Sequence, residues 1–545
     1  MKADIVIAGG GLAGIATAIE LLDQNLSVIL VDRDLESRFG GLAQWALGGL
    51  FYVDSPFQRK AGIKDSPEQA FRDWETTAEF GPEDHWPRKW AEQYVSRCTA
   101  DVYEWLKPKG IKYIPSVQWV ERGLLEPGNS VPRFHVTWGT GWALTKTLIH
   151  HLQNHPNRSN LQLFFQHKAE EILMHNGYAS GLQILNEVSG ERFEIQADQV
   201  VIAAGGMMGD VEVVKKNWYK DWGSPPEYML SGSHLMANGE IHEIAARAGA
   251  VVTHLDKQWN YAAGVHHMDA EHPQHGLSLI PPKSVLWTNY QGKRLGPMPM
   301  VSGYDTRALV ERICQEEKKY SWIVMNERIA LKELGVSGSL YNDANREQRK
   351  WDFAKSILFG NKSLVETMKS RCQDMLVANS VSELVGKMNA LTGTNDVDGS
   401  LLQKEIEQFD LHASRPASLH NDEQFRRIAH LRQYRGDKLR LVKRPQIMDP
   451  KGGPLIAIRS FILARKSLGG IQTDLGGRVL TESGEAIPGL YAVGEAAGFG
   501  GGGIHGLRAL EGTFLGNCIF NARMAVRDLV GKRQQSVGAG QTLAG

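Results

Sequence analysis

Residues 4–32 combine residue types and spacing that bind the pyrophosphate of a dinucleotide. The apolar run Ile5–Ala8 predicts a strand, which leads through the turn Gly9-Gly10-Gly11-Leu12-Ala13-Gly14 into an alanine- and leucine-rich helix. In such a turn the first glycine permits a tight bend, the second lets the backbone approach a pyrophosphate, and the third lets the helix pack closely on the sheet. The helix N-terminus adds its partial positive charge. We therefore expect contacts to a dinucleotide from Gly9, Gly11, Leu12, Ala13 and Gly14.

A second apolar strand ends at Asp32. A carboxylate at this place can accept hydrogen bonds from the adenosine ribose, and we expect the neighbouring Arg33 to lie at the same end of the cofactor. The alternative is a glycine-rich turn without a ligand, and it does not account for the flanking strand, the helix and the distal acid. The sequence contains no second unit of this kind, so no separate NAD(P)H domain is predicted.

Composition excludes several classes of function. The 545 residues hold 61 lysines plus arginines and 61 aspartates plus glutamates, so the overall charge favours neither nucleic acid nor an acidic membrane as a partner. The four cysteines form no Cys-x-x-Cys pair, which favours buried thiols in a reducing compartment over a metal or dithiol centre. No metal site is predicted. The first strand begins almost at Met1 and no apolar run could span a bilayer, so we expect a cytoplasmic protein.

A second glycine-rich loop, Phe39–Gly49, follows Asp32. It resembles the flavin-contacting loop of the fumarate reductase and succinate dehydrogenase flavoprotein superfamily, which includes the 3-ketosteroid Δ1-dehydrogenases. The segments Val200–Gly206 and Gly489–Glu495 are similar to the strand behind the adenosine half and to the strand whose terminal acid binds the ribityl chain. The resemblance implies that the dinucleotide is FAD. It places further FAD contacts at Gly40, Gly41, Leu42, Ala43, Gly48, Gly49, Ala169, Ala204, Gly205, Gly494, Glu495, Gly512, Thr513 and Phe514.

The position of Leu42 bears on how FAD is attached. Members of the superfamily that link FAD through a histidine carry that residue six positions before the paired glycines equivalent to Gly48 and Gly49, and this position is Leu42 here. The resemblance therefore implies noncovalent FAD. Trp45, the segments 51–56 and 84–88, and Gly500–Gly503 narrow the resemblance to a subgroup of FAD-binding dehydrogenases related to the ketosteroid enzymes.

The same resemblance implies an α/β fold, with a Rossmann-like FAD-binding domain of the GR2 type and an inserted α+β cap. Between residues 251 and 445 the sequence loses its alternation of strand and helix patterns, and the FAD motifs resume after Pro445. We expect the FAD-binding domain at 1–250 and 446–530, the cap or substrate domain at 251–445, and a flexible tail at 531–545. Within the cap, helical periodicity from Lys350 to Leu411 predicts a solvated helical wall.

Flavin chemistry on a carbon–carbon bond needs hydride transfer at flavin N5, proton transfer at the neighbouring carbon, and donors that hold an activating carbonyl or carboxylate. By resemblance, Arg307 stands at the position of the arginine that protonates substrate in fumarate reductases; an ion pair of the cap is the alternative. Lys466 replaces a histidine that binds a substrate carboxylate. Arg508 lies one residue before the position of a carboxylate-clamping arginine, which is Ala509 here.

The ketosteroid dehydrogenases instead use tyrosines to remove a proton and to bind the 3-keto oxygen, one of them in the loop that matches Gly500–Gly506. This chain has glycines and His505 in that loop. Because imidazole titrates near neutrality, His505 is a candidate acid or base, and a packed histidine is the alternative. Tyr304 is the best tyrosine candidate in the cap. Further aromatic residues are candidates for core positions or for an apolar pocket; they are Trp119, Trp138, Trp142, Trp259, Tyr261 and Trp287.

These residues leave three functions open. The first is an FAD-dependent oxidoreductase, a dehydrogenase or reductase, that acts on a CH–CH or C=C bond next to a carbonyl of a small molecule. Its second substrate would be an unidentified electron donor or acceptor. The second function is a fumarate-reductase-like enzyme for a small carboxylate. The third is a flavin redox sensor or electron carrier that docks on a protein partner.

Overall fold

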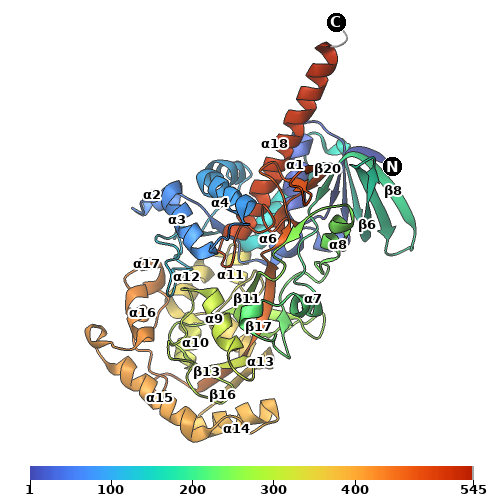
Figure 1. Ribbon diagram of the computed structural model, residues 1–545. Coiled ribbons are helices and arrows are strands. Elements are labelled where there is room, and N and C mark those ends of the chain that lie inside the picture. The colour runs from blue at the N-terminus through green and yellow to red at the C-terminus, as the bar shows by residue number, and fades with distance from the viewer. Residues whose placement is uncertain (543–545) are drawn as a thin grey trace.

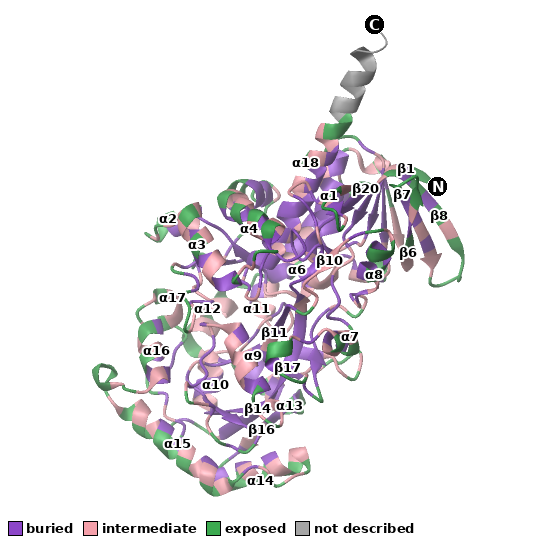
Figure 2. Ribbon diagram, in the orientation of Figure 1, coloured by how far each residue is buried: buried purple, intermediate pink, exposed green. Residues whose placement is uncertain are grey.

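The computed structural model describes the backbone of residues 1–542 and the side chains of residues 1–533. It has two lobes, each built around a sheet, and helix α18 projects beyond the first sheet (Figure 1). We call the lobe around the first sheet the cofactor lobe and the lobe around the second sheet the cap. The buried residues concentrate in the two sheets and in the helices that pack on them (Figure 2).

The first sheet has the strand order β19–β20–β8–β1–β2–β5, and β7 and β6 extend it from β8. The central strands β20, β8, β1, β2 and β5 run parallel. Ile5 lies opposite Val28 and Ala8 opposite Val31, so β1 and β2 end at the same edge. The strands are β1 (Lys2–Ala8), β2 (Val28–Asp32), β5 (Leu161–Phe165), β6 (His167–His175), β7 (Tyr178–Asn186), β8 (Arg192–Ile202), β19 (Arg478–Leu480) and β20 (Ala486–Ala492).

Helices cover both faces of this sheet, which explains why its central strands are apolar throughout. On one face α1 (Leu12–Asp23) packs against α18 (Thr513–Thr542) and α6 (Thr140–Gln153). On the other face, Ile241 and Ile244 of α8 (Glu240–Arg247) share a core with Val6. The parallel sheet therefore places the turn after β1 and the end of β2 at one carboxyl edge, as the sequence predicts.

The second sheet has the order β13–β14–β17–β11–β12–β15, and β16 and β9 also pair with β17. Its long strand β17 ends with Lys466 and Ser467, so the sheet delivers these two residues to the boundary between the lobes. The strands are β9 (Leu230–Ser231), β11 (Gln258–His266), β12 (Gly276–Ile280), β13 (Leu286–Asn289), β14 (Tyr320–Asn326), β15 (Gly335–Val336), β16 (Met375–Ala378) and β17 (Leu455–Ser467).

Helices pack around the second sheet and extend to the far end of the cap, where Figure 1 shows α14 and α15. The stretch from Lys350 to Leu411, predicted to be helical, contains α12 to α15 and one strand, β16. The cap helices are α9 (Thr306–Cys314), α10 (Glu327–Glu333), α11 (Asp343–Arg346), α12 (Lys350–Phe359), α13 (Lys362–Arg371), α14 (Val381–Thr392), α15 (Gly399–Ser414), α16 (Glu423–Leu431) and α17 (Arg435–Lys438).

Shorter elements connect the lobes or cover the cofactor lobe. The helices are α2 (Pro56–Lys60), α3 (Pro67–Ala78), α4 (His85–Cys98), α5 (Glu104–Leu106) and α7 (Val211–Lys216), and the strands are β3 (Gly49–Phe51), β4 (Phe134–Val136), β10 (Val252–Thr253) and β18 (Gly470–Ile471).

The strand pairing crosses the domain boundaries expected from the sequence. β9 precedes residue 251 and β17 follows residue 445, yet both lie in the second sheet. The segment expected to be a tail, 531–545, begins inside α18, and its last three residues lie outside the described part of the chain. In the described residues, no helix combines the length and hydropathy needed to cross a membrane.

Candidate active site

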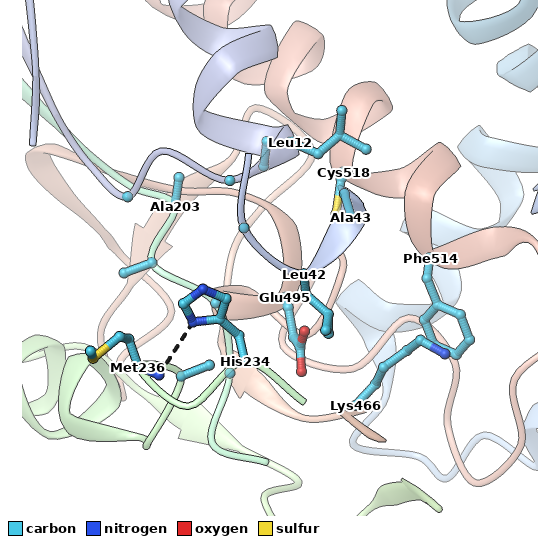
Figure 3. A pocket seen from close by; sticks show the side chains of 18 of the residues that line it. Leu12, Leu42, Ala43, Ala203, His234, Met236, Lys466, Glu495, Phe514 and Cys518 are labelled. Carbon is cyan, nitrogen blue, oxygen red and sulfur yellow. Dashed lines mark hydrogen bonds between the residues drawn. The ribbon is translucent and has the colours of Figure 1, made fainter. Parts of the chain in front are cut away.

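A cleft runs between the carboxyl edge of the first sheet and the end of β17, and both lobes line it (Figure 3). It holds about 1700 Å³ of empty space, its open mouth included. Ligand sites occur preferentially at such boundaries between domains.

The turn after β1 is shaped to hold a pyrophosphate. A Cβ atom at Gly9 would lie 2.4 Å from the Ala203 carbonyl oxygen, and one at Gly14 would lie 2.0 Å from the Gly9 carbonyl oxygen. A Cβ at Gly11 would meet no atom within 4 Å, because Gly11 faces the open cleft. Gly11 is also the N-cap of α1, and no side chain caps this helix. The first N–H groups of α1 are therefore free to bind phosphate oxygens.

Asp32 and Arg33 lie at the next part of the cleft. Asp32 accepts hydrogen bonds from the Gly10 N–H at 2.6 Å and the Asp34 N–H at 2.7 Å, and burial raises the pKa of its carboxyl group. Its two oxygens keep lone pairs for a ribose hydroxyl. Arg33 pairs with Glu187 at 2.9 Å and with Glu240 at 3.0 Å, which fixes its stem along the cleft.

The second glycine-rich loop forms the middle of the cleft. The backbone of Gly48 has φ +86°, and a Cβ there would lie 2.0 Å from Thr137 Oγ1. The backbone of Gly40 has φ +114°, and a Cβ atom there would clash with the side chain of Thr145 behind the cleft wall. Leu42 lines the cleft (Figure 3) and offers an aliphatic side chain where a covalent link would need a nucleophile.

Most of the residues predicted to bind FAD line this cleft, and four support it from behind. Gly14, Gly40, Gly494 and Thr513 are the supporting residues. Those that line the cleft are Gly9, Gly11, Leu12, Ala13, Asp32, Arg33, Gly41, Leu42, Ala43, Gly48, Gly49, Ala169, Ala204, Gly205, Glu495, Gly512 and Phe514.

Glu495 places a partly buried carboxylate in the same cleft. Its Oε1 accepts hydrogen bonds from the Ser467 N–H at 2.8 Å and from the Ser467 hydroxyl at 3.3 Å. Burial raises the pKa of the Glu495 carboxyl group. The remaining oxygen can accept from a hydroxyl of a ribityl chain. Ser467, the last residue of β17, therefore joins this anchor to the second sheet.

Three polar side chains gather at the far end of the cleft. Lys466 Nζ donates to Tyr261 Oη at 3.1 Å, and Tyr261 Oη donates to Glu511 Oε1 at 2.6 Å. Trp259 Nε1 donates to the same Glu511 oxygen at 2.9 Å. Lys466 Nζ also lies 4.1 Å from the centroid of the Phe514 ring (Figure 3). We call Lys466, Tyr261 and Glu511 the polar cluster.

The ammonium group of Lys466 loses its proton at a lower pH than an ordinary lysine does. Burial lowers the pKa of its ammonium group to about 8, although Glu511 acts in the opposite direction. Burial and the Glu511 charge raise the pKa of Tyr261 well above its usual range, so Tyr261 stays a neutral phenol. The polar cluster therefore contains a cationic donor, a neutral linker and a carboxylate, which is the set that acid–base work beside a carbonyl needs.

Arg465, beside Lys466 on β17, brings a second cation to the cleft. Its side chain is buried, and burial lowers the pKa of the guanidinium group. Within residues 1–533 it forms no ion pair with a carboxylate.

Arg307 lies outside the residues that line the cleft. Its guanidinium is buried 4.3 Å from the ring centroid of Tyr219 and 4.5 Å from that of Trp222. Burial and the nearby Arg508 lower the pKa of Arg307. In this structure the side chain is therefore held by two aromatic rings of the loop after α7.

His505 also lies outside the cleft wall. It is fully buried, stacks on Trp74 at 5.7 Å between ring centroids, and shares a hydrogen bond of 2.9 Å between Nε2 and Thr513 Oγ1. Burial and the Lys466 charge lower the pKa of His505 to about 3. The imidazole is therefore neutral and packed behind Phe514, whose ring centroid is 4.8 Å away.

Tyr304 and Arg508 also lie outside the residues that line the cleft, and both contact other side chains of the protein. Tyr304 Oη donates to the Arg427 carbonyl at 3.2 Å and contacts His430 Nδ1 at 3.0 Å, under α16. Arg508 pairs with Glu79 and, at 3.4 Å, with Asp305 at the start of α9. Of the five predicted catalytic side chains, Lys466 is the one that lines the cleft.

Sequence reasoning did not single out Tyr261 or Glu511 as site residues. Tyr261 is one of several aromatic residues, in or before the predicted cap, that are candidates for core positions or for an apolar pocket. Its place in the site depends on two irregularities in the pairing of β11 with β17, on either side of the Asn260–Tyr261 stretch. Glu511 lies two residues after Ala509, which occupies the position of the carboxylate-clamping arginine. An acid so close to that position was the one feature of the sequence that could have indicated Glu511 as a site residue.

The model of the FAD binding domain family matches residues 4–515. The chain belongs to this family. It is an FAD-dependent oxidoreductase, and we propose that the cleft described above holds its FAD.

Similar proteins agree on the class of chemistry. The chain is 40% identical over 546 residues to a KsdD-like steroid dehydrogenase of Mycobacterium tuberculosis, covering 97% of this chain and 95% of the relative. It is also 40% identical over 531 residues to a KsdD-like steroid dehydrogenase of Mycolicibacterium smegmatis, covering 94% and 96%.

Solved structures show the same fold at low identity. The structure of 3-ketosteroid Δ1-dehydrogenase from Sterolibacterium denitrificans matches with a TM-score of 0.67 at 14% identity, over 97% of this chain and 100% of the other. The open conformation of a flavocytochrome c3 fumarate reductase matches with a TM-score of 0.67 at 18% identity, over 96% of this chain and 77% of the other. The predicted α/β fold of the flavoprotein superfamily is confirmed.

Proposed function

We propose that the protein oxidises or reduces a carbon–carbon bond next to the carbonyl of a steroid-like ketone. The polar cluster at the end of the cleft carries this proposal, because a partly buried ammonium group, a phenol and a carboxylate lie within one hydrogen-bonded chain. The 40% identical relatives are KsdD-like steroid dehydrogenases, which supports the same class of substrate.

Each member of the cluster has a separate role in this proposal. Bound FAD supplies the hydride transfer. Lys466 donates a hydrogen bond to the carbonyl oxygen and stabilises the negative charge that develops there as the neighbouring C–H bond weakens. Glu511 accepts the proton in dehydrogenation and returns it in reduction. Tyr261 orients both groups, since it accepts from Lys466 and donates to Glu511.

A small carboxylate is the second candidate substrate. Arg465 favours it, because its buried guanidinium lines the cleft beside Lys466 without an ion pair in the described residues. Three observations favour the ketone over the carboxylate. Glu511 would repel a bound anion, and the clamp position is the fully buried Ala509. The apolar rings of Phe134, Phe499 and Phe514 in the cleft wall also suit a flat apolar ligand.

Reoxidation of the reduced enzyme tests the substrate class. The FAD-loaded protein is reduced without oxygen and mixed with a 3-keto-Δ1 steroid enone or, separately, with fumarate. We expect the flavin absorbance to return with the enone and to remain bleached with fumarate. Return with fumarate alone would replace the ketone with the carboxylate as substrate. No return with either compound would contradict both and favour an electron carrier.

The variant Lys466→Ala tests the anchor in the same assay. We expect the reoxidation rate to fall by about 10²-fold, the cost typical of removing one donor to a developing oxyanion. The absorbance spectrum of bound FAD should stay unchanged. Lys60→Ala, a change of an exposed lysine on α2, serves as the control and should reoxidise like the wild type. An unchanged rate in Lys466→Ala would remove Lys466 from the site.

A further inference from the structure

Helix α12 presents large apolar side chains to solvent. Trp351 is 83% exposed, Leu358 57% and Phe359 81%, and Lys355 is exposed between them. These positions recur at the spacing that places side chains on one side of a helix, so they form a single stripe. All ten residues of α12 have described side chains, and none is buried.

A group of cations lies beside this helix. Between residues 435 and 444, five basic side chains are exposed, and none of them forms an ion pair within residues 1–533. Asp437, the acid in this stretch, pairs instead with Arg122. Leu439, 48% exposed, adds an apolar side chain among them. The five cations are Arg435, Lys438, Arg440, Lys443 and Arg444.

The end of α10 contacts both helix α12 and the cationic stretch 435–444. Lys332 Nζ donates to the carbonyl oxygens of Ile357 at 2.7 Å and Leu358 at 3.0 Å, at the end of α12. The next residue, Glu333, accepts the backbone N–H of Val442 at 2.9 Å, inside the cationic stretch. The end of α12 and the cationic stretch therefore both contact the end of α10. We call Trp351, Leu358, Phe359 and the five cations together the α12 surface.

Helix α12 and the segment before α11 pack against parts of the cofactor lobe near the cleft. Phe353 of α12 packs edge-on against Trp138 at 5.3 Å between ring centroids. Ser339 lies shortly before α11. Its N–H donates to the backbone carbonyl of Trp45 at 2.9 Å, and its hydroxyl donates to the backbone carbonyl of Gln44 at 2.8 Å. Gln44 and Trp45 belong to the loop whose preceding residues line the cleft.

We propose that the α12 surface docks on an anionic lipid bilayer. A helix that carries tryptophan, phenylalanine and leucine on one side, flanked by lysine and arginine, has the composition that lies in a membrane interface. The cations would contact negatively charged headgroups while the three apolar side chains enter the boundary of the acyl chains. Charge decides against a second copy of this chain, because a two-fold contact would bring the same cations together.

Vesicle sedimentation tests the docking. The full-length FAD-loaded protein is mixed, without substrate, with phosphatidylcholine vesicles that contain or lack about a third phosphatidylglycerol. We expect binding to the anionic vesicles, which weakens as salt is raised. The double variant Trp351→Ser/Phe359→Ser and the triple variant Lys438→Gln/Lys443→Gln/Arg444→Gln should each weaken binding at least about tenfold.

Matched controls separate docking from loss of structure. Val188→Ser removes a side chain that is 70% exposed on the cofactor lobe, and Lys60→Gln removes an exposed cation on α2. Both should bind vesicles like the wild type. Because all variants change exposed side chains, FAD content should also remain unchanged. Vesicle binding is measured without substrate. A negative result would therefore contradict the membrane docking and leave the proposed reaction unaffected.

Three results would overturn the proposal. Equal binding to neutral and anionic vesicles is one, and unchanged binding by both α12-surface variants is another. The third is absent vesicle binding together with a dimer in sedimentation velocity that the Trp351→Ser/Phe359→Ser variant dissociates, because this face would then be a contact between copies of the chain.

Discussion

Lys466 lies 4.1 Å from the Phe514 ring centroid and donates to Tyr261, so aromatic and phenolic groups replace most of its water. This environment weakens the preference for the charged form, which is why the pKa of Lys466 falls to about 8. A lysine in this state is charged at neutral pH yet changes its charge within a mildly alkaline range. Its role as a carbonyl donor therefore predicts a specific pH dependence.

The rate should fall as pH rises through about 8, because the neutral amine no longer stabilises the developing negative charge. The group has a lowered pKa, so its cationic form is present below that value and is lost above it. In the variant Lys466→Arg the charge persists, so the alkaline fall should disappear even if the rate is lower overall. Profiles of kcat/KM against pH for both proteins check this. An alkaline fall that Lys466→Arg retains would assign the titration to another group.

More of the residues expected to contact the cofactor line the cleft than of those expected to be catalytic. Gly9, Gly11 and Asp32 follow from local geometry, since a strand, a turn and a helix suffice to place them. Tyr261 and Glu511 meet only because β11 and β17 pair with an irregular register and the chain returns after β20. No local pattern encodes such a meeting. Arg307 and His505 were selected by resemblance, and in this structure aromatic rings enclose both.

At the scale of elements, the turn between β1 and α1 separates two kinds of glycine. A Cβ at Gly14 would lie 2.0 Å from the Gly9 carbonyl oxygen, so Gly14 serves the packing of α1 on β1. A Cβ at Gly11 would meet no atom of the protein within 4 Å, and the φ of Gly11 is −72°, which other residues adopt easily. We therefore expect Gly11 to serve the ligand rather than the fold.

The variant Gly11→Ala should leave the protein without FAD as stable as the wild type, or more stable by about 0.4–1 kcal/mol. The affinity for FAD should fall, because the new methyl group occupies the path of the pyrophosphate. Tm measured with and without added FAD checks both effects, since FAD raises Tm only where it binds. Gly14→Ala is the contrasting control and should lower Tm even without FAD. A normal FAD-dependent rise in Tm for Gly11→Ala would contradict the proposed place of the pyrophosphate.

At the scale of the whole molecule, a buried acid joins the cofactor lobe to the cap. Glu121 accepts the Thr306 N–H at 3.0 Å and the Thr306 hydroxyl at 2.5 Å, at the first residue of α9. Burial, followed by the charges of Asp305 and Glu511, raises the pKa of Glu121 to about 8. The contact is therefore most stable with Glu121 protonated, and ionisation weakens the junction between the lobes.

The variant Glu121→Gln should make stability less sensitive to pH. In the wild type, the stabilisation from the raised pKa is complete below about 4.5 and is lost as pH rises through about 8. Relative to the wild type, the free energy of unfolding of Glu121→Gln should therefore rise between these values by at most about 1.4 kcal/mol per pH unit. Denaturant unfolding at several pH values checks this, with the exposed Glu191→Gln as control. A difference between variant and wild type that does not change with pH would contradict the assignment.

Strand β17 determines at which residues the cap could be exchanged for that of a relative. It pairs with β11, β14, β16 and β9, carries Arg465 and Lys466, and ends at Ser467, which holds Glu495. A chimera that exchanged residues 251–445 for those of a relative would leave this strand with the host and give the foreign cap a mismatched partner. Engineers who want to transplant substrate preference must therefore move residues 455–467 together with the rest of the cap.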